Sequence, residues 1–456
     1  MSGGEPAHRT WRYRWVVLGV ATFTQAASGF FVQGIGAMGV HLQRDLSLST
    51  AQLGLLLSAA QLVPLAGLPV AGKLLDRYDE RWVVGAGACV VAVSLGAGSA
   101  AQGYGSLLLV LLIVGAGYST VQPGGSKSVA SWFDASRRGL AMGIRQAGLP
   151  LGGLLAAAVL PALAAALGWR VTLVAGALVA LLGAVAFMGL YRRPPARSLR
   201  RYGTPHGGGV PRDDGVPRDD GVPRDDGALH GSQPRVPLAS RFGTRLRPLR
   251  DPATVKIILS GTSLVTVHSG IGVLTVLHLH EVTAVGAGTA ALVLVAAQGA
   301  GAAGRICLAA WSDRSGSGRY ASVLTCMAAV TAGMLALITP LGRSPVAACL
   351  VFVWLGFFGI GWYGPWVAYV AESAPPGRTG STLGSAMAVN QIAVVAAPPA
   401  LGLLRDLTGA FTPVWVLLSV MTALALTVTA RAGHTGPGHG GGPAAGSPVK
   451  VRKSRS

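Results

Sequence analysis

Residues 66–77 read AGLPVAGKLLDR, and residues 303–314 read AGRICLAAWSDR. The two stretches align at a constant offset of 237 residues, with Ala, Gly, Asp and Arg in matching places. A second match, at an offset of 241 residues, pairs the glycines at 139 and 143 with those at 380 and 384. Similarity at a near-constant offset indicates that the chain consists of two halves that repeat each other.

The composition places both halves in a membrane. Of the 456 residues, 51% are hydrophobic and only 12% are charged, and the mean hydropathy is +0.52. A soluble protein carries about a quarter charged residues, so most of this chain must face lipid. A span needs about twenty apolar residues, and about twelve such segments are present. They cover 15–41, 50–71, 82–104, 106–130, 139–165, 170–190, 254–280, 284–308, 320–341, 346–370, 378–404 and 412–432.

The sequence therefore predicts an all-α membrane protein of twelve transmembrane helices in two six-helix bundles, related by a pseudo-twofold axis. The N-terminal bundle covers 1–191, and the C-terminal bundle covers 253–433. Between them, 192–252 is rich in Arg, Gly, Pro and Asp, and repeats GVPRDD three times. This segment lacks the apolar residues for a core, so we predict a disordered linker, and a disordered basic tail over 434–456.

Orientation follows from the basic residues, because Lys and Arg are held on the cytoplasmic side. One side of the predicted topology carries most of them, including the linker and the tail. The other side carries only Arg44, Arg170, Arg343 and Arg405. We therefore expect both termini in the cytoplasm, and the net charge of +20 needs no nucleic-acid partner. The excess of Arg over Lys is typical of a bacterium with a GC-rich genome, and hence of a plasma-membrane location.

No catalytic centre, metal site or cofactor is expected. The four cysteines are irregularly spaced within apolar stretches, and the cluster of His278, His280 and Glu281 lacks a fourth metal ligand. A phosphate-binding Gly-x-x-x-x-Gly-Lys-Ser/Thr motif is absent from the sequence, as is a nucleophile–base constellation within the spans. The sequence thus predicts that the chain is not an enzyme. It also predicts that an ion or solute gradient drives any transport.

The stretch Gly72-x-Leu74-x-Asp76-Arg77-x-x-x-Arg81 resembles the loop signature of the major facilitator superfamily, and Ser312-Asp313-Arg314-Ser315-Gly316 resembles its weaker second copy. One departure is Asp79, which stands where the signature usually has glycine. The resemblance implies a multi-pass secondary transporter, a symporter or antiporter that works by alternating access. It also implies a cytoplasmic gating loop made by Gly72, Asp76, Arg77, Arg81, Asp313 and Arg314.

Two arginines are candidate ligands for an anion. Arg305 lies eight residues before Asp313, about 12 Å along the helix, where the first half has Leu68. A guanidinium binds a carboxylate with two donors, and distantly similar monocarboxylate and oxalate-formate carriers use an arginine in the eighth span. Arg145, about 9 Å into the fifth span, is a second candidate together with Gln146. The alternatives are a structural arginine at 305 and a snorkelling one at 145.

Further polar residues are candidates for a cavity between the halves. Tyr118, Gln122, Trp362 and Tyr363 could line it, although a Trp near a membrane boundary is also a common interface anchor. Gln25, Gln33, Asn390 and Gln391 are further candidates. His268 is the only histidine well inside a predicted span and is a candidate for proton coupling; the alternative is a packed, hydrogen-bonded histidine.

The sequence thus favours a transporter of a small solute, an organic or inorganic anion. All 17 acidic residues lie outside the predicted spans. Exporters of lipophilic cations and proton symporters often place a carboxylate inside the bundle, so its absence argues against both. Efflux of amphipathic drug-like compounds remains an alternative, as does a non-transporting membrane receptor or scaffold. The expected partners are a small-molecule solute, the lipid bilayer and a coupling ion, with the chain as a monomer.

Overall fold

A computed structural model of the chain describes residues 5–35, 39–48, 50–194, 252–315 and 318–431. The predicted linker lies outside these ranges except at its two ends, and the predicted tail lies wholly outside them. Within the described residues, every regular element is a helix.

The first half contains the helices α1 to α8. Their bounds are α1 (Glu5–Gly34), α2 (Gly39–Asp45), α3 (Thr50–Leu62), α4 (Pro64–Arg77), α5 (Glu80–Gly98), α6 (Tyr104–Trp132), α7 (Ala135–Leu167) and α8 (Trp169–Leu190). The second half contains α11 (Pro252–Thr283), α12 (Ala287–Arg314), α13 (Arg319–Ile338), η3 (Pro340–Arg343), α14 (Pro345–Gly359), α15 (Tyr363–Glu372), α16 (Thr379–Thr408) and α17 (Thr412–Arg431).

The prediction of twelve spans in two six-helix bundles is confirmed. Eleven segments of the described chain are helical, long and apolar enough to cross a membrane. The twelfth span consists of α3 and α4 together, which only Val63 separates. The φ of −61° and ψ of −38° at Val63 are helical, and the following Pro64 has no backbone N–H, so one hydrogen bond of the helix is missing there.

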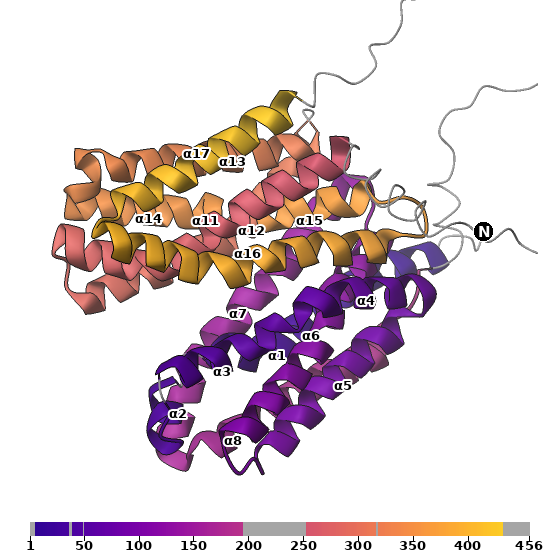
Figure 1. Cartoon of the computed structure of the whole chain (residues 1–456). Coiled ribbons are helices and arrows are strands. Elements are labelled where there is room, and N and C mark those ends of the chain that lie inside the picture. Colours follow the sequence, from indigo (N-terminus) through magenta and orange to yellow (C-terminus); the bar gives the residue numbers. More distant parts are fainter. Residues whose placement is uncertain (1–4, 36–38, 49, 195–251, 316–317, 432–456) are drawn as a thin grey trace, which may run out of the picture.

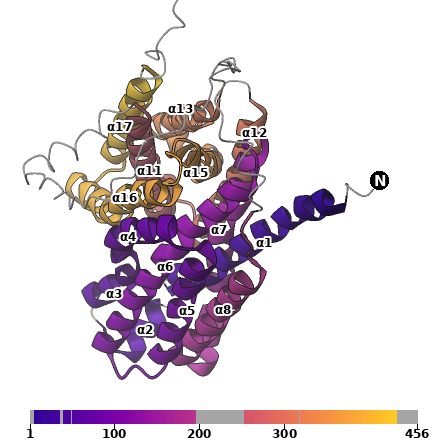
Figure 2. The same cartoon turned by 90° about the vertical axis from the view of Figure 1, so that its right-hand side faces the viewer.

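The two bundles meet at one end and diverge toward the other (Figure 1). We call the end where the bundles meet the basic end, because it carries the arginine-rich loops. There α4, α12 and α15 finish, and α5, α7, α13 and α16 begin. The opposite end is called the far end. Figure 2 views the molecule from the basic end, where α4 lies beside α16 and α7 lies beside α12.

Glycines bring the two bundles into backbone contact at the basic end. A Cβ atom at Gly72 of α4 would lie 2.6 Å from the carbonyl oxygen of Gly380 in α16. On the other side, a Cβ atom at Gly364 would lie 2.6 Å from the carbonyl oxygen of Arg305 and 3.1 Å from the Cα of Gly143. Small residues allow membrane helices to approach this closely. The glycines repeated in the sequence therefore mark where the bundles cross.

Inside the N-terminal bundle, Gly183 of α8 packs against α1. Its carbonyl oxygen accepts a hydrogen bond from Thr24 Oγ1 at 2.9 Å, and a Cβ atom there would lie 2.8 Å from the Cβ of Ala27. The opposite face of α8 is exposed at Leu182 and Val185, which suits a face turned to lipid.

We expect Gly183→Val to lower the free energy of unfolding by about 1–3 kcal/mol, because the added side chain overpacks the contact between α1 and α8. Thermal unfolding in detergent measures the effect. Gly189→Val is the matched control, since Gly189 lies on the same helix and a Cβ atom added there would meet no atom within 4 Å. Equal losses for both variants would contradict the packing argument.

Candidate functional site

A cavity of about 190 Å³ lies between the bundles. The N-terminal bundle lines it with Gln33, Gln61, Tyr118, Gln122 and Leu149. The C-terminal bundle contributes polar side chains from α11, α12 and α16 and an aromatic pair from the start of α15. A second cavity, of about 260 Å³, lies within the C-terminal bundle near His278, Arg343 and Trp415. Of these two, only the first joins both bundles, so a solute bound there would contact both halves of the chain.

Arg305 reaches this cavity from α12 and is 4% exposed. Its Nη1 donates a hydrogen bond to the backbone oxygen of Gln146 in the opposite bundle at 2.7 Å, and its Nε donates to the oxygen of Ile360 at 3.2 Å. Among the described residues, Nη2 has no hydrogen-bond partner. The guanidinium also lies 5.7 Å from the ring centroid of Tyr363. One nitrogen of a buried cation is thus left for a ligand.

Arg145 lies elsewhere. It is fully buried inside the N-terminal bundle, where its Nη1 donates to Ser126 Oγ at 2.8 Å and its Nη2 donates to the backbone oxygens of Val121 and Gln122. These bonds tie α7 to α6 close to Pro123. The side chain of Gln146 accepts a hydrogen bond from Gln25 at 3.0 Å, also inside the bundle. Neither Arg145 nor Gln146 lines the cavity, so neither side chain is placed to bind a ligand beside Arg305.

The four aromatic and amide candidates do line the cavity. Tyr118 and Gln122 face it from α6, and Trp362 and Tyr363 face it from the start of α15. Trp362 is fully buried and stands edge-on to Tyr363 at 5.2 Å between ring centroids, so it is no interface anchor. Three aromatic rings with polar tips and one amide thus line the cavity, from both bundles.

Amides in the lining of the same cavity bridge the bundles. Gln391 of α16 donates from Nε2 to the backbone oxygen of Gln61 at 2.9 Å, and the Gln61 amide lies 3.4 Å from that of Gln33. Asn390 also lines the cavity and is 3% exposed. His268 of α11 lines it as well, and its ring has no hydrogen-bond partner among the described residues. The sequence analysis missed Gln61, although a glutamine within the predicted span 50–71 is a signal of the same kind as Gln25 and Gln33.

Two carboxylates close the basic end. Asp76, near the end of α4, accepts hydrogen bonds from the backbone N–H groups of Gly380 and Ser381 at 2.7 and 2.8 Å. Asp313, near the end of α12, accepts from the N–H groups of Gly139 and Leu140 at 2.9 and 2.6 Å. Gly380 and Ser381 are the second and third residues of α16, so Asp76 binds N–H groups that have no partner within their helix, where the helix dipole also favours negative charge. Gly139 and Leu140 lie in the second turn of α7, so Asp313 binds the opposite bundle one turn further into its helix.

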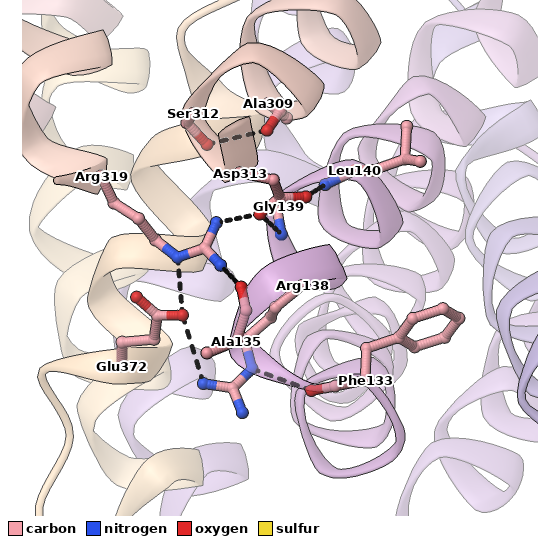
Figure 3. A network of polar contacts seen from close by, with 10 residues as sticks. All are labelled: Phe133, Ala135, Arg138, Gly139, Leu140, Ala309, Ser312, Asp313, Arg319 and Glu372. Carbon is pink, nitrogen blue, oxygen red and sulfur yellow. Dashed lines mark hydrogen bonds and ion pairs between the residues drawn. The ribbon is translucent and has the colours of Figure 1, made fainter. Parts of the chain in front are cut away.

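An ion-pair network surrounds Asp313 (Figure 3). Arg319 contacts Asp313 at 2.5 Å and Glu372 at 2.6 Å, and it donates to the backbone oxygen of Ala135. Glu372 also pairs with Arg138 across the bundles at 3.3 Å. The sequence analysis missed Arg319 and Glu372. The repeat offered a signal for Arg319, because it follows Asp313 by six residues as Arg81 follows Asp76 by five.

The other arginines of the expected gating loop do not join the bundles. Arg77 and Arg314 are exposed, and Arg77 lies over the ring of Tyr78. Arg81 donates from Nε to the backbone oxygen of Met188 in its own bundle at 2.5 Å. The gate contacts in this structure are therefore those of the two carboxylates, with Gly72 at the helix crossing.

A third charged cluster fixes the loop after Asp76. Lys127 pairs with Glu80 at 2.9 Å and donates to the backbone oxygen of Leu75, at the end of α4. The Tyr191 hydroxyl donates to Glu80 at 3.3 Å. Burial, and then the neighbouring Glu80 carboxylate, raise the pKa of Tyr191 above its ordinary value, so the phenol stays a donor at neutral pH.

The chain resembles known transporters over most of its length. It is 27% identical over 424 residues to an uncharacterized MFS-type transporter of Mycobacterium tuberculosis, covering 91% of this chain and 84% of that one. It is 27% identical over 159 residues to a hexuronate transporter of Bacillus subtilis, covering 35% of this chain and 38% of that one. The solved structure of the proton:xylose symporter XylE superposes with a TM-score of 0.68 at 14% identity, covering 92% of this chain and 96% of XylE.

The family model of the Major Facilitator Superfamily matches residues 21–398. This range contains both repeated loops, both closing carboxylates and the cavity between the bundles. The chain therefore belongs to the major facilitator superfamily, as the loop signature predicted.

Proposed function

We propose that this chain is a secondary active transporter that moves a small anion, organic or inorganic, across the plasma membrane by alternating access. Arg305 carries the proposal. It is the one cation among the described residues that line the cavity between the bundles, and its Nη2 is free to bind a ligand. Buried charge within a membrane protein is costly and is usually retained for function.

The size of the cavity favours a small solute over an amphipathic drug. Pockets for drug-sized ligands span about 300–1,000 Å³, whereas this cavity measures about 190 Å³. Among its described lining residues there is no carboxylate to attract an organic cation. The partial likeness to a hexuronate transporter points in the same direction, because a hexuronate is a small molecule with one carboxylate.

The state of the carrier follows from the positive-inside rule. The basic end carries the arginine-rich loops, so we assign it and both termini to the cytoplasm. Closing contacts at this end, with bundles that diverge at the far end, then correspond to an outward-facing state (Figure 1). Transport requires that these contacts break while the far end closes.

Arg305 links ligand binding to this gate. In the structure its guanidinium holds the Gln146 carbonyl of the opposite bundle at 2.7 Å. An anion in the cavity competes for the same guanidinium, because a charged acceptor binds it more strongly than a neutral carbonyl does. Binding would therefore weaken one tie between the bundles beside the cavity.

We expect Arg305→Gln to abolish anion binding, because the substitution removes the positive charge and keeps similar bulk. The measurement is ligand-induced thermal stabilisation in detergent across lactate, oxalate, gluconate, galacturonate and sulfate, since a ligand that binds the folded state stabilises it. Arg170→Gln is the control; Arg170 donates to the backbone oxygen of Ala101, away from the cavity.

Flux into proteoliposomes then separates a carrier from a receptor or scaffold, which would bind without transport. Stabilisation by lipophilic compounds alone, unchanged in Arg305→Gln, would contradict the anion carrier and favour efflux of amphipathic compounds.

For the gate, we expect Asp76→Asn and Asp313→Asn each to weaken the closed basic end by roughly 1.5–3 kcal/mol, the usual contribution of a hydrogen bond to a charged group. Spin labels at the exposed positions 82 and 311, in a cysteine-free background, report the distance between the bundles by pulsed EPR. A longer distance should become populated in both variants. The control is Asp406→Asn at the far end, and an unchanged distance in all three variants would show that the carboxylates do not hold the gate.

A further inference from the structure

The cavity between the bundles holds an unusual set of ionisable groups. Among its described lining residues these are His268, Arg305, Tyr118 and Tyr363. A carboxylate, the usual proton carrier within a membrane bundle, is not among them. Histidine is the side chain whose ordinary titration lies between pH 5 and 8, so His268 is the candidate proton carrier among these groups.

Several helices place side chains around the cavity that His268 lines. α12 contributes Arg305, α15 contributes Tyr363, and α6 contributes Tyr118 from the opposite bundle. α16 contributes Met387, Asn390, Gln391 and Val394, none of which titrates. α14 and α17 also pack against α11, but they place no residue in the lining of this cavity. Arg305 is therefore the one fixed charge that His268 shares the cavity with, among the described residues.

The neighbouring histidine of the same helix shows what a structural histidine looks like here. His278 Nδ1 accepts a hydrogen bond from Trp415 Nε1 at 3.1 Å, its Nε2 lies 3.5 Å from the oxygen of Gly342, and its ring stands edge-on to Phe352 and Phe411. Both ring nitrogens are engaged. Among the described residues, no donor and no backbone oxygen contacts the ring nitrogens of His268 in this way, although His268 lines a polar cavity.

We propose that His268 binds the proton that accompanies the anion, which makes the protein a proton–anion symporter; this rests on the proposed function. While Arg305 has no anion beside it, its charge opposes a second positive charge in the same small cavity. An anion neutralises that charge, and the imidazole then accepts a proton on its free ring nitrogen. The two binding events favour each other reciprocally.

The charge balance of this scheme is simple. The empty cavity carries one positive charge, on Arg305. A cavity that holds a monovalent anion and a proton on His268 carries the same net charge. Loaded and empty carriers would therefore change state with the same charge between the bundles, and one proton would cross with each monovalent anion.

Isothermal titration calorimetry on the full-length protein in detergent tests the proposal. The probes are lactate, oxalate, gluconate, galacturonate and sulfate, which stay ionised from pH 6 to 8. Comparing buffers of different ionisation enthalpy gives the number of protons taken up per anion. We expect up to one proton in the wild type, and an affinity that falls up to about tenfold per pH unit as the pH rises.

His268→Gln should take up no proton and show an affinity independent of pH, whereas His280→Gln should behave as the wild type. His280 is the matched control because it is exposed and contacts the backbone oxygen of Val285, outside the cavity. Anion binding without proton uptake in the wild type would overturn the inference and leave the anion carrier intact, even if His268→Gln failed to fold.

Proton uptake that persists in a folded His268→Gln protein would assign the proton to another group and also overturn the inference. Absence of binding by every probe to the wild type would overturn the proposed function itself.

Discussion

A carboxylate near the end of one helix that accepts two backbone N–H groups from the first two turns of a helix in the other bundle is the interaction on which this structure depends. It occurs twice, at Asp76 with Gly380 and Ser381, and at Asp313 with Gly139 and Leu140. The start of a helix leaves N–H groups without partners, and Asp76 binds two such groups of α16. Each bundle thus accepts backbone N–H groups of the other at the closed end.

The cavity depends on the same arrangement. Because the bundles meet at their basic ends and diverge toward the far end, space for a ligand remains between them (Figure 1). Polar side chains from both bundles meet there, with Gln61 bound to Gln391 and Arg305 bound to the Gln146 carbonyl. The site is therefore made of contacts that cross the boundary between the bundles, and a change at the gate changes the site.

The twelve spans and the two bundles could be predicted from the sequence. Bilayer thickness fixes the length of a span, and the internal repeat shows that the chain has two similar halves. Arg305 was found because a buried charge is rare in a span and has no counterpart in the first half. Arg145 shows the limit: it satisfies the same criterion, yet it binds the carbonyls of α6. Which way an arginine points depends on packing between helices, which composition does not record. The pairing of Arg319 with Glu372 depends equally on two loops meeting in space.

Two helices have a weak point beside the cavity, one in each bundle. The first lies between α3 and α4, where Pro64 has no N–H to donate, and the second lies between α14 and α15 at residues 360–362. Gln61 lies just before the first, and Trp362 lies at the second. A solute in the cavity would therefore contact each bundle next to the place where one of its helices is least regular.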